Sequence, residues 1–258
     1  MNIVVLVKQV PDSGSERNLA GDNTVERQSA NNVINEMDEY AIEEALKIQE
    51  AHGGEVTILT MGPERATESI RKALSMGPDK AVHVLDDALH GSCAVATSKV
   101  LAAALGTLNA DLIIAGAEST DGRVQVLPHM IAERLGVAAL TGARKLTVDG
   151  GTLTIERQTE EGYEVVTAAT PAVVSVWDTI NEPRYPSFKG IMAAKKKPVQ
   201  TLALADLGVD AGEVGFAGAS SEVVEHAKRP ARSGGQKVAD DGNGGVALVE
   251  FLSSEKFV

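Results

Sequence analysis

The side chains best suited to hold a ligand are gathered in one short polar stretch, residues 117–122. Ser119 and Thr120 supply hydroxyl groups and Asp121 supplies a carboxylate, shortly after Gly116. Together with the backbone amides of a following helix start, these groups suit a phosphate. The pattern alone leaves two interpretations open, a phosphate-binding loop or a solvated turn in which Asp121 serves as a capping residue.

The elements around this stretch place it at the edge of a parallel sheet. Residues 112–115 form a short apolar run, which is typical of a strand buried on both faces. A helical pattern follows from about Val124 to Leu135, and Gly136 ends it. In open parallel sheets, ligands bind at the loops that leave the carboxyl ends of the strands. The strand–loop–helix order therefore predicts a ligand site at residues 116–127.

The sequence contains no recognisable catalytic machinery. It has no Ser/His/Asp, Cys/His or HExxH arrangement, and it lacks the GxGxxG and GxxxxGK[ST] fingerprints of dinucleotide-binding and P-loop proteins. Its five histidines are scattered along the chain, and no metal site is expected. Any chemistry in which the protein takes part would therefore have to be carried out by a cofactor.

The composition is that of a globular protein with an acidic surface. The chain has 258 residues, of which 43% are hydrophobic and 3% aromatic, and its formal net charge is −12. Scarce aromatic side chains and negative charge argue against nucleic-acid binding. No apolar run reaches the roughly 18 residues that span a bilayer. With a single cysteine, Cys93, and no targeting segment, the sequence predicts a cytoplasmic protein.

The first half of the chain alternates between strand and helix signals. Asn35 is expected to cap the first helix, and Ser92 a later one. Four strand–helix units in succession predict an α/β fold with a doubly wound, mostly parallel sheet and helices on both faces. The polar residues 8–32 interrupt this order as a long loop. The predicted strands lie at residues 2–7, 55–61, 81–85 and 112–115.

The second half changes character after Gly136. Alternating polar and apolar residues at 145–148 and 152–157 flank the turn Asp149-Gly150-Gly151, which predicts a hairpin. Further strands are expected at 163–169 and 172–176. We therefore expect an antiparallel hairpin extension of the parallel sheet.

Residues 178–197 read as an irregular segment that displays large apolar side chains. Pro183 and Pro186 are expected to exclude a regular helix. The segment is either a contact surface or a loop folded back into its own core. Its apolar residues are Ile180, Tyr185, Phe188, Ile191 and Met192, and three lysines, 195–197, follow.

The last quarter of the chain is less compact by pattern. Residues 201–207 predict a strand or a helical turn, and residues 228–245 have the composition of a flexible linker. The apolar period of residues 245–257 predicts a terminal helix, which we expect to dock on a partner chain. The sequence thus divides into an α/β domain, 1–195, and a C-terminal arm, 196–258.

Three stretches together resemble one family, the β (small) subunit of electron transfer flavoproteins. The resemblance runs from the first strand to the terminal helix, and the combination of stretches is specific. The matching segments are Ile155–Val166 (IERQTEEGYEVV) with Pro171–Ser175 (PAVVS), Asn181–Lys197 (NEPRY through KKK), and Val5–Asp12 (VLVKQVPD) with Asn35 and Asp38–Leu46.

The resemblance implies an electron-carrier subunit rather than an enzyme. It implies a heterodimer with a larger α subunit that holds a redox-active FAD, and a structural AMP in this chain. The pair would take electrons from acyl-CoA and related dehydrogenases and pass them to a quinone oxidoreductase or another acceptor. The implied AMP-binding residues are Leu6, Asn35, Glu36, Met37, Asp38, Met61, Gly116, Ser119, Thr120, Asp121, Gly122, Arg123, Val124, Gln125, Val126 and Leu127.

The resemblance also assigns residues 181–197 as a recognition loop for flavin dehydrogenases. Phe188 falls where the family places an aliphatic anchor. The implied docking residues are Tyr185, Phe188, Ile191, Met192 and Lys195.

The nucleotide loop departs from the family pattern. Pro128 stands where a glycine often occurs, and Glu36 stands where a proline follows the asparagine. Two alternatives to the AMP-binding carrier therefore stay open. One is a second FAD in this chain, as in electron-bifurcating relatives; the other is a stand-alone nucleotide-binding sensor or hydrolase.

Overall fold

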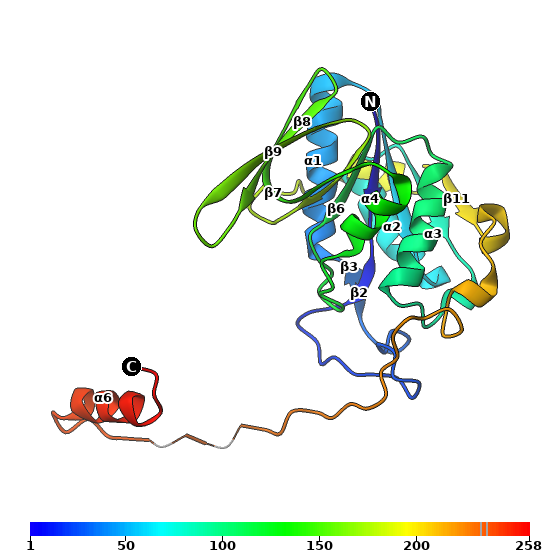
Figure 1. Ribbon diagram of the computed structural model, residues 1–258. Coiled ribbons are helices and arrows are strands. Elements are labelled where there is room, and N and C mark those ends of the chain that lie inside the picture. The colour runs from blue at the N-terminus through cyan, green and yellow to red at the C-terminus, as the bar shows by residue number, and fades with distance from the viewer. Residues whose placement is uncertain (233, 236) are drawn as a thin grey trace. The chain divides into compact units, whose positions relative to one another are not determined.

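The apolar runs of the sequence assemble into a nine-stranded sheet in the order β11-β5-β4-β1-β6-β10-β7-β8-β9 (Figure 1). This computed structural model describes residues 1–232, 234–235 and 237–258. All neighbouring pairs from β11 to β7 are parallel, and the β7–β8 and β8–β9 pairs are antiparallel. The bounds are β11 Val199–Leu202, β5 Lys80–Val84, β4 Glu55–Met61, β1 Asn2–Leu6, β6 Leu112–Gly116, β10 Ala172–Val176, β7 Ala138–Asp149, β8 Thr152–Gln158 and β9 Tyr163–Ala169.

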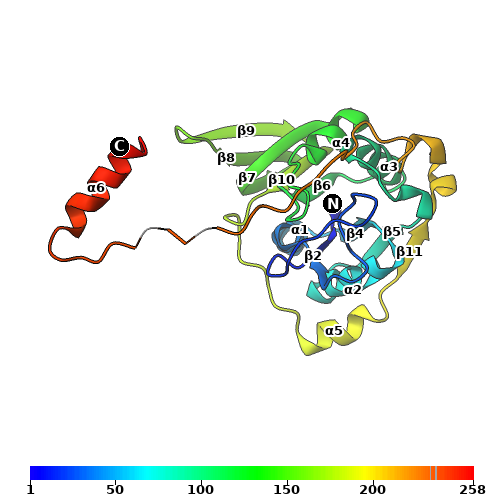
Figure 2. The same ribbon diagram turned by 90° about the horizontal axis from the view of Figure 1, so that it is seen from below.

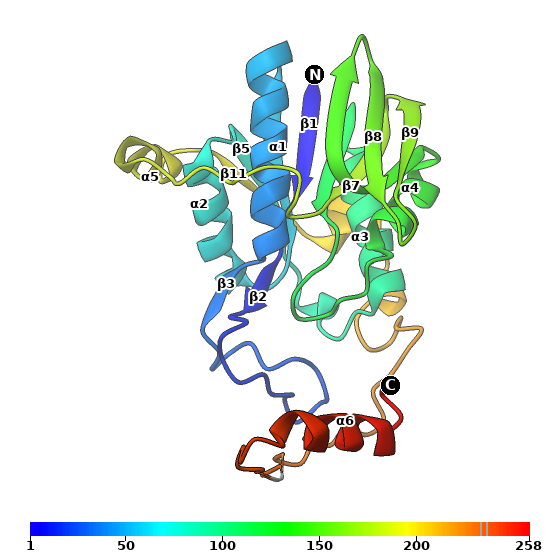
Figure 3. The same ribbon diagram turned by 90° about the vertical axis from the view of Figure 1, so that its left-hand side faces the viewer.

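Helices cover both faces of the parallel part, as predicted (Figure 2). Side chains alternate along β1, so that Ile3 and Val5 join the core under α1 and α2 while Val4 joins the core under α3 and α4. Figure 3 shows α1 and α2 beside the sheet from another direction. Because both faces are covered, the central strands are apolar throughout. These helices are α1 Glu36–His52, α2 Thr67–Met76, α3 Ala94–Gly106 and α4 Leu127–Leu135.

The predicted antiparallel extension is confirmed, and β7 forms its junction with the parallel sheet. The first residues of β7 pair with β10, and the rest pair with β8. Gly142 adopts a φ of 73° at this changeover. Gly150 and Gly151, with φ of 52° and 85°, form the predicted turn to β8.

Two helix starts differ from the prediction. The fourth helix begins at Leu127 rather than at Val124, because Arg123 and Gln125 have positive φ values of 50° and 59° that interrupt a helix. Ser92 does not cap α3, whose N-cap residue is Cys93. The Ser92 hydroxyl instead accepts a hydrogen bond from the Gly215 amide at 2.8 Å.

The expectation that residues 178–197 contain no regular helix is wrong. A short helix, α5 (Phe188–Ala194), begins after Pro186, so the prolines precede the helix and do not interrupt it. The Ser187 hydroxyl caps it by accepting a hydrogen bond from the Gly190 amide at 3.0 Å.

The main compact unit extends further than the predicted boundary at residue 195. It runs from Met1 to Val224, because β11 pairs with β5 and the 3₁₀ turn Leu204–Leu207 packs against the core. The second unit, Glu225–Val258, contains the predicted terminal helix as α6 (Gly244–Ser254). The predicted linker, 228–245, includes residues 233 and 236, which lie outside the described residues.

A small antiparallel pair closes the long polar loop at its two ends. β2 (Gln9–Pro11) follows β1 after Val7 and Lys8, and β3 (Asn32–Ile34) leads into α1. This pair brings Asn35 and the N-terminus of α1 next to the carboxyl end of β1.

Candidate nucleotide-binding site

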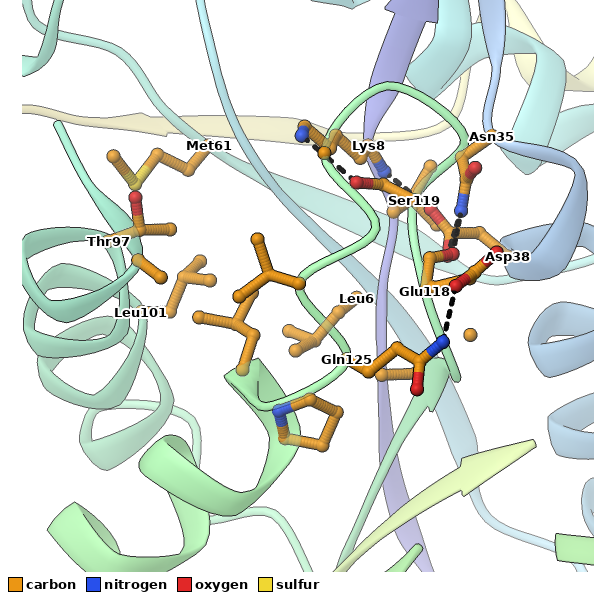
Figure 4. A pocket seen from close by; sticks show the side chains of 18 of the residues that line it. Leu6, Lys8, Asn35, Asp38, Met61, Thr97, Leu101, Glu118, Ser119 and Gln125 are labelled. Carbon is orange, nitrogen blue, oxygen red and sulfur yellow. Dashed lines mark hydrogen bonds between the residues drawn. The ribbon is translucent and has the colours of Figure 1, made fainter. Parts of the chain in front are cut away.

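The carboxyl ends of β1, β4 and β6 open into a cavity of about 580 Å³ (Figure 4). Pockets of roughly 300–1,000 Å³ are typical of small-molecule sites. The structure thus brings the end of β1, the start of α1 and the loop after β6 to one place, as the sequence predicts. Of the predicted residues, Leu6, Asn35, Asp38, Met61, Gly116, Ser119, Gly122, Val124, Gln125 and Leu127 line the cavity.

Asn35 connects the start of α1 to the loop after β6. Its Oδ1 accepts a hydrogen bond from the Thr120 amide at 3.1 Å, and its Nδ2 donates to the Glu118 carbonyl at 3.0 Å. Nδ2 also donates to the Asp38 carboxylate at 3.0 Å. Asn35 therefore occupies the predicted N-cap position without capping α1 through its side chain. The side chain instead holds the ligand loop in place.

Asp38 is a buried carboxylate at the junction of three elements. It accepts a hydrogen bond from the Lys8 amide at 2.7 Å, in addition to the one from Asn35. Burial raises the pKa of Asp38 to about 7, against the opposing effect of the hydrogen bonds from Asn35, Lys8 and Gly116. The hydrogen bonds to the Asp38 carboxylate come from Lys8 and Asn35, so Asp38 holds the end of β1 and the N-terminus of α1 together.

Gly116 is required by close packing against α1. A Cβ atom at this position would lie 2.6 Å from both Asp38 Oδ1 and Met37 Cβ. Met37 does not line the cavity, and it contributes to this packing through its Cβ and its backbone carbonyl carbon. The close approach places the ligand loop directly over the N-terminus of α1.

Asp121 does not line the cavity but fixes the ligand loop from behind. Its side chain is 2% exposed and contacts Lys8 Nζ at 2.8 Å and the Arg27 guanidinium. Burial alone would raise the pKa of Asp121, but Lys8 and Arg27 hold it well below its usual range. Lys8 and Arg27 both line the cavity, so they present positive charge to a ligand while Asp121 orients them.

The loop before α4 offers backbone amides suited to an anion. Positive φ values at Arg123 and Gln125 alternate with ordinary backbone angles, a geometry that turns successive N–H groups toward one point. The amides of Gly122, Val124 and Gln125 donate to no backbone acceptor within the described residues. The loop can therefore bind a phosphate through its main chain.

The remaining predicted residues lie outside the cavity. Glu36 is exposed at the start of α1, and Arg123 is exposed with its Nε 4.0 Å from a Glu118 carboxylate oxygen. Val126 is 41% exposed and precedes α4. The buried hydroxyl of Thr120 has no hydrogen-bond partner in the described part of the chain.

The opposite end of the cavity is apolar and includes residues that the sequence did not single out. Leu101 and Thr97 of α3 lie on this side together with Met61 (Figure 4). Helix α3 comes from a different strand–helix unit, and no local pattern marks it as a ligand wall. Lys8, in contrast, lies two residues after the end of β1, so the strand-end rule could have identified it.

The described residues contain no group of three or more His, Cys, Asp or Glu side chains placed to hold a metal ion. None of the described helices is long and apolar enough to span a membrane. The site is thus built from a cationic pair, main-chain amides and an apolar wall.

Comparison with known proteins identifies the family of this fold and site. A family model described as electron transfer flavoprotein domain matches residues 22–207. The electron transfer flavoprotein subunit beta of Mycobacterium leprae is 54% identical over 264 residues, which cover 100% of this chain and 99% of that protein. This chain belongs to the electron transfer flavoprotein β-subunit family.

More distant members of the β-subunit family also match across most of the chain. The subunit from Thermoanaerobacterium thermosaccharolyticum is 40% identical over 225 residues, or 87% of this chain and 86% of that protein. The subunit from Bacillus subtilis is 37% identical over 211 residues, or 81% and 82%. The sequence resemblance to this family is therefore confirmed.

In this β subunit, the predicted docking residues form an exposed apolar surface on and before α5. Tyr185 is 94% exposed and Phe188 is 81% exposed. Ile191 and Met192 are 46% and 49% exposed, and Lys195 follows the helix at the surface. Ile180, the fifth apolar residue of this segment, packs against the core under α1 and α2, whereas these four apolar side chains are exposed.

Proposed function

We propose that this chain is the small subunit of a heterodimeric electron carrier and holds AMP in the cavity beside β1, β4 and β6. The observation that carries the proposal is the pairing of main-chain amides at 122–125 with Lys8 and Arg27 at one end of a cavity whose other end is apolar. A phosphate suits the first end and a purine base suits the second.

Different residues around the cavity would bind different parts of AMP. The amides of the loop before α4, with Lys8 and Arg27, receive the phosphate. Leu6, Met61 and Leu101 enclose the base and exclude water. Asn35, Asp38 and Asp121 fix the backbone around the ligand, so AMP acts as part of the fold.

The electron-transfer chemistry belongs to the partner subunit in this proposal. FAD held mainly by the α subunit would supply reversible electron uptake, and this chain contributes binding surfaces without catalytic residues. Within the described residues, no metal-ligand cluster offers another redox centre. The cytoplasm is the proposed location.

The exposed surface around Phe188 is the proposed docking site for acyl-CoA and related flavin dehydrogenases. A large aromatic side chain that is 81% exposed is costly to leave in water and effective as an anchor. The electrons would then pass to a quinone oxidoreductase or another acceptor. The apolar terminal helix α6 is the proposed contact with the α subunit.

The nucleotide content of the purified heterodimer tests the proposal. Both subunits are co-expressed, the complex is denatured, and released nucleotides are identified by mass and counted per heterodimer. One FAD and one AMP support the proposal. Two FAD molecules would identify an electron-bifurcating subunit, and ATP hydrolysis by the isolated chain would identify a stand-alone nucleotide enzyme.

A further inference from the structure

The exposed surface on α5 is held at both ends by charged side chains that do not belong to the surface itself. On one side, Arg184 binds two glutamates of α1, and we name Arg184, Glu43 and Glu50 the α1 clasp. On the other side, Arg71 and Lys197 bind main-chain carbonyls at the ends of α2 and α5, and we name them the α2 clasp. Tyr185 and Phe188 lie between the two.

The α1 clasp is a multiply bonded ion pair with a buried component. Arg184 Nε and Nη2 donate to the two oxygens of Glu43 at 2.7 and 3.0 Å, and Nη1 donates to Glu50 at 2.6 Å. The Arg184 amide also donates to Glu43, at 3.1 Å. Glu43 is 6% exposed, so removing Arg184 would leave a buried carboxylate without its cationic partner. Hydrogen bonding to Arg184 lowers the pKa of Glu50 despite the opposing effect of burial.

A neighbouring amide strengthens the same attachment. Asn181 Nδ2 donates to the Tyr40 carbonyl and to Glu44, both at 3.0 Å. The segment just before Tyr185 thus donates hydrogen bonds to four acceptor groups of α1, three carboxylates and one main-chain carbonyl. The attachment fixes the backbone of a segment that contains two prolines and no secondary structure before α5.

The α2 clasp fixes the far end of the surface. Arg71 Nη1 donates to the carbonyls of Ala194 and Lys197 at 2.7 and 2.9 Å. Lys197 Nζ donates to the carbonyls of Leu74, Gly77 and Pro78 at 3.1, 2.7 and 2.6 Å. Both side chains satisfy carbonyls in the last turns of α2 and α5, where intrahelical partners are missing, and in the residues that follow them.

Close packing holds α5 against α2 between the clasps. A Cβ atom at Gly190 would lie 2.5 Å from the Ser75 carbonyl oxygen. Ala194 is 3% exposed and joins the core under α1 and α2. One face of α5 is therefore fixed, and the face that carries Ile191 and Met192 remains in solvent.

We propose that Arg184 is a positioning residue that preorganises the Tyr185–Phe188 surface for partner proteins by fixing its backbone to α1. The inference rests on the proposed docking function of that surface. Arg184 is 34% exposed in its side chain and its donors are directed to Glu43 and Glu50, so it acts through the loop rather than as a contact. Preorganised surfaces bind more tightly because less conformational entropy is lost on association.

The test compares Arg184→Gln and Arg184→Lys with wild type in the intact heterodimer. Electron transfer from an acyl-CoA dehydrogenase is measured at varied heterodimer concentration. Loss of loop order should raise the KM for the heterodimer about tenfold in both variants with little change in kcat. Arg144→Gln, which removes another arginine from an ion pair with a glutamate, is the matched control and should behave as wild type.

Chymotrypsin cleavage after Phe188 in the free heterodimer supplies a readout independent of docking, whereas the bond after Tyr185 is protected by Pro186. We expect faster cleavage in both Arg184 variants at unchanged nucleotide content. Because Arg184→Gln leaves Glu43 buried without a cation, Glu43→Gln/Arg184→Gln serves as a variant that removes the unpaired charge. It should keep the fold and show the same faster cleavage.

Two results would overturn the positioning role, and a third would separate it from the proposed docking function. Wild-type cleavage rates in Arg184→Gln and in the double variant would show that the clasp does not order the loop. A normal KM in Arg184→Lys, with a defect in Arg184→Gln that disappears at high salt, would assign Arg184 a direct charge role. If Phe188→Ala leaves transfer unchanged, the docking function itself fails, and faster cleavage in the Arg184 variants would still report the clasp.

Discussion

The Lys8 ammonium lies 2.8 Å from the Asp121 carboxylate, a contact that joins the end of β1 to the ligand loop 113 residues later. Asp121→Asn should lower the free energy of unfolding by about 1–2 kcal/mol. The effect is smaller than for a fully buried ion pair, because Lys8 and Arg27 are partly exposed to solvent. Urea unfolding at neutral pH measures this. Asp149→Asn, at an exposed hairpin turn, is the control and should be neutral. Equal effects of the two substitutions would contradict the role of Asp121.

The approach of Gly116 to α1 predicts a steric effect of a single methyl group. Gly116→Ala should destabilise the chain by about 1–3 kcal/mol and release the nucleotide, because its Cβ would meet Asp38 and Met37. Gly106→Ala is the matched control, since no atom lies within 4 Å of a Cβ there. Thermal unfolding and nucleotide content check both. Retained nucleotide in Gly116→Ala would show that the α1 contact does not shape the site.

The buried carboxylate of Asp38 predicts a pH dependence of stability. Its pKa in the folded chain is about 7, above the value of about 3.9 in an unfolded chain. Between these values the folded state binds more protons, so the contribution of Asp38 to stability falls as pH rises from about 4 to about 7 and is level above that. The difference in unfolding free energy between wild type and Asp38→Asn, measured across this window, should follow that slope. Parallel pH profiles of the two proteins would rule the prediction out.

The exposed ring of Phe188 predicts a loss of partner binding without a loss of folding. Phe188→Ala should raise the KM of the heterodimer for electron transfer from an acyl-CoA dehydrogenase by about 10- to 100-fold, because it removes an apolar anchor. Phe188→Leu keeps an apolar side chain of useful size and should retain most of the activity. Stopped-flow reduction of the flavin gives the comparison. Equal defects in both variants would argue against an apolar anchor at this position.

We expect assembly of the heterodimer to depend on the C-terminal unit, because α6 is the proposed contact with the α subunit. Deleting residues 225–258 should leave the folding of Met1–Val224 intact, since these form separate compact units, and should weaken the heterodimer. Replacing four exposed apolar residues of α6 by serine should reproduce the assembly defect without shortening the chain. These residues, which are 51–60% exposed, are Val246, Leu248, Val249 and Phe251. Size-exclusion chromatography with the α subunit measures assembly. Normal heterodimer from the truncated chain would remove α6 from the interface.

Several structural features could be predicted from sequence because they depend on local periodicity. The apolar runs at 2–7 and 112–115 are too continuous for half-buried strands, which predicts central parallel strands. The Asp149-Gly150-Gly151 turn predicts its hairpin in the same local way. The loop after the 112–115 strand is likewise predicted as a candidate site, because strand order alone places it at the sheet edge.

The error at α5 and the late start of α4 have one physical cause. Residue type alone does not show that Pro186 lies outside the helix that follows it, or that Arg123 and Gln125 adopt positive φ although neither is a glycine. Such choices are stabilised by contacts that form only in the folded chain. The Glu118 carboxylate, for example, accepts a hydrogen bond from Gln125 Nε2 at 2.6 Å.

Residue types at fixed spacing predict the α/β class, the order of strands and helices in the first half, and the family. In contrast, the packing of the folded chain sets three features: Lys8 and Arg27 share Asp121, α3 supplies a wall of the cavity, and Arg184 joins Glu43 across 141 residues. These pairings join residues far apart in the chain. No local pattern encodes such distances, because they are set by how the layers pack.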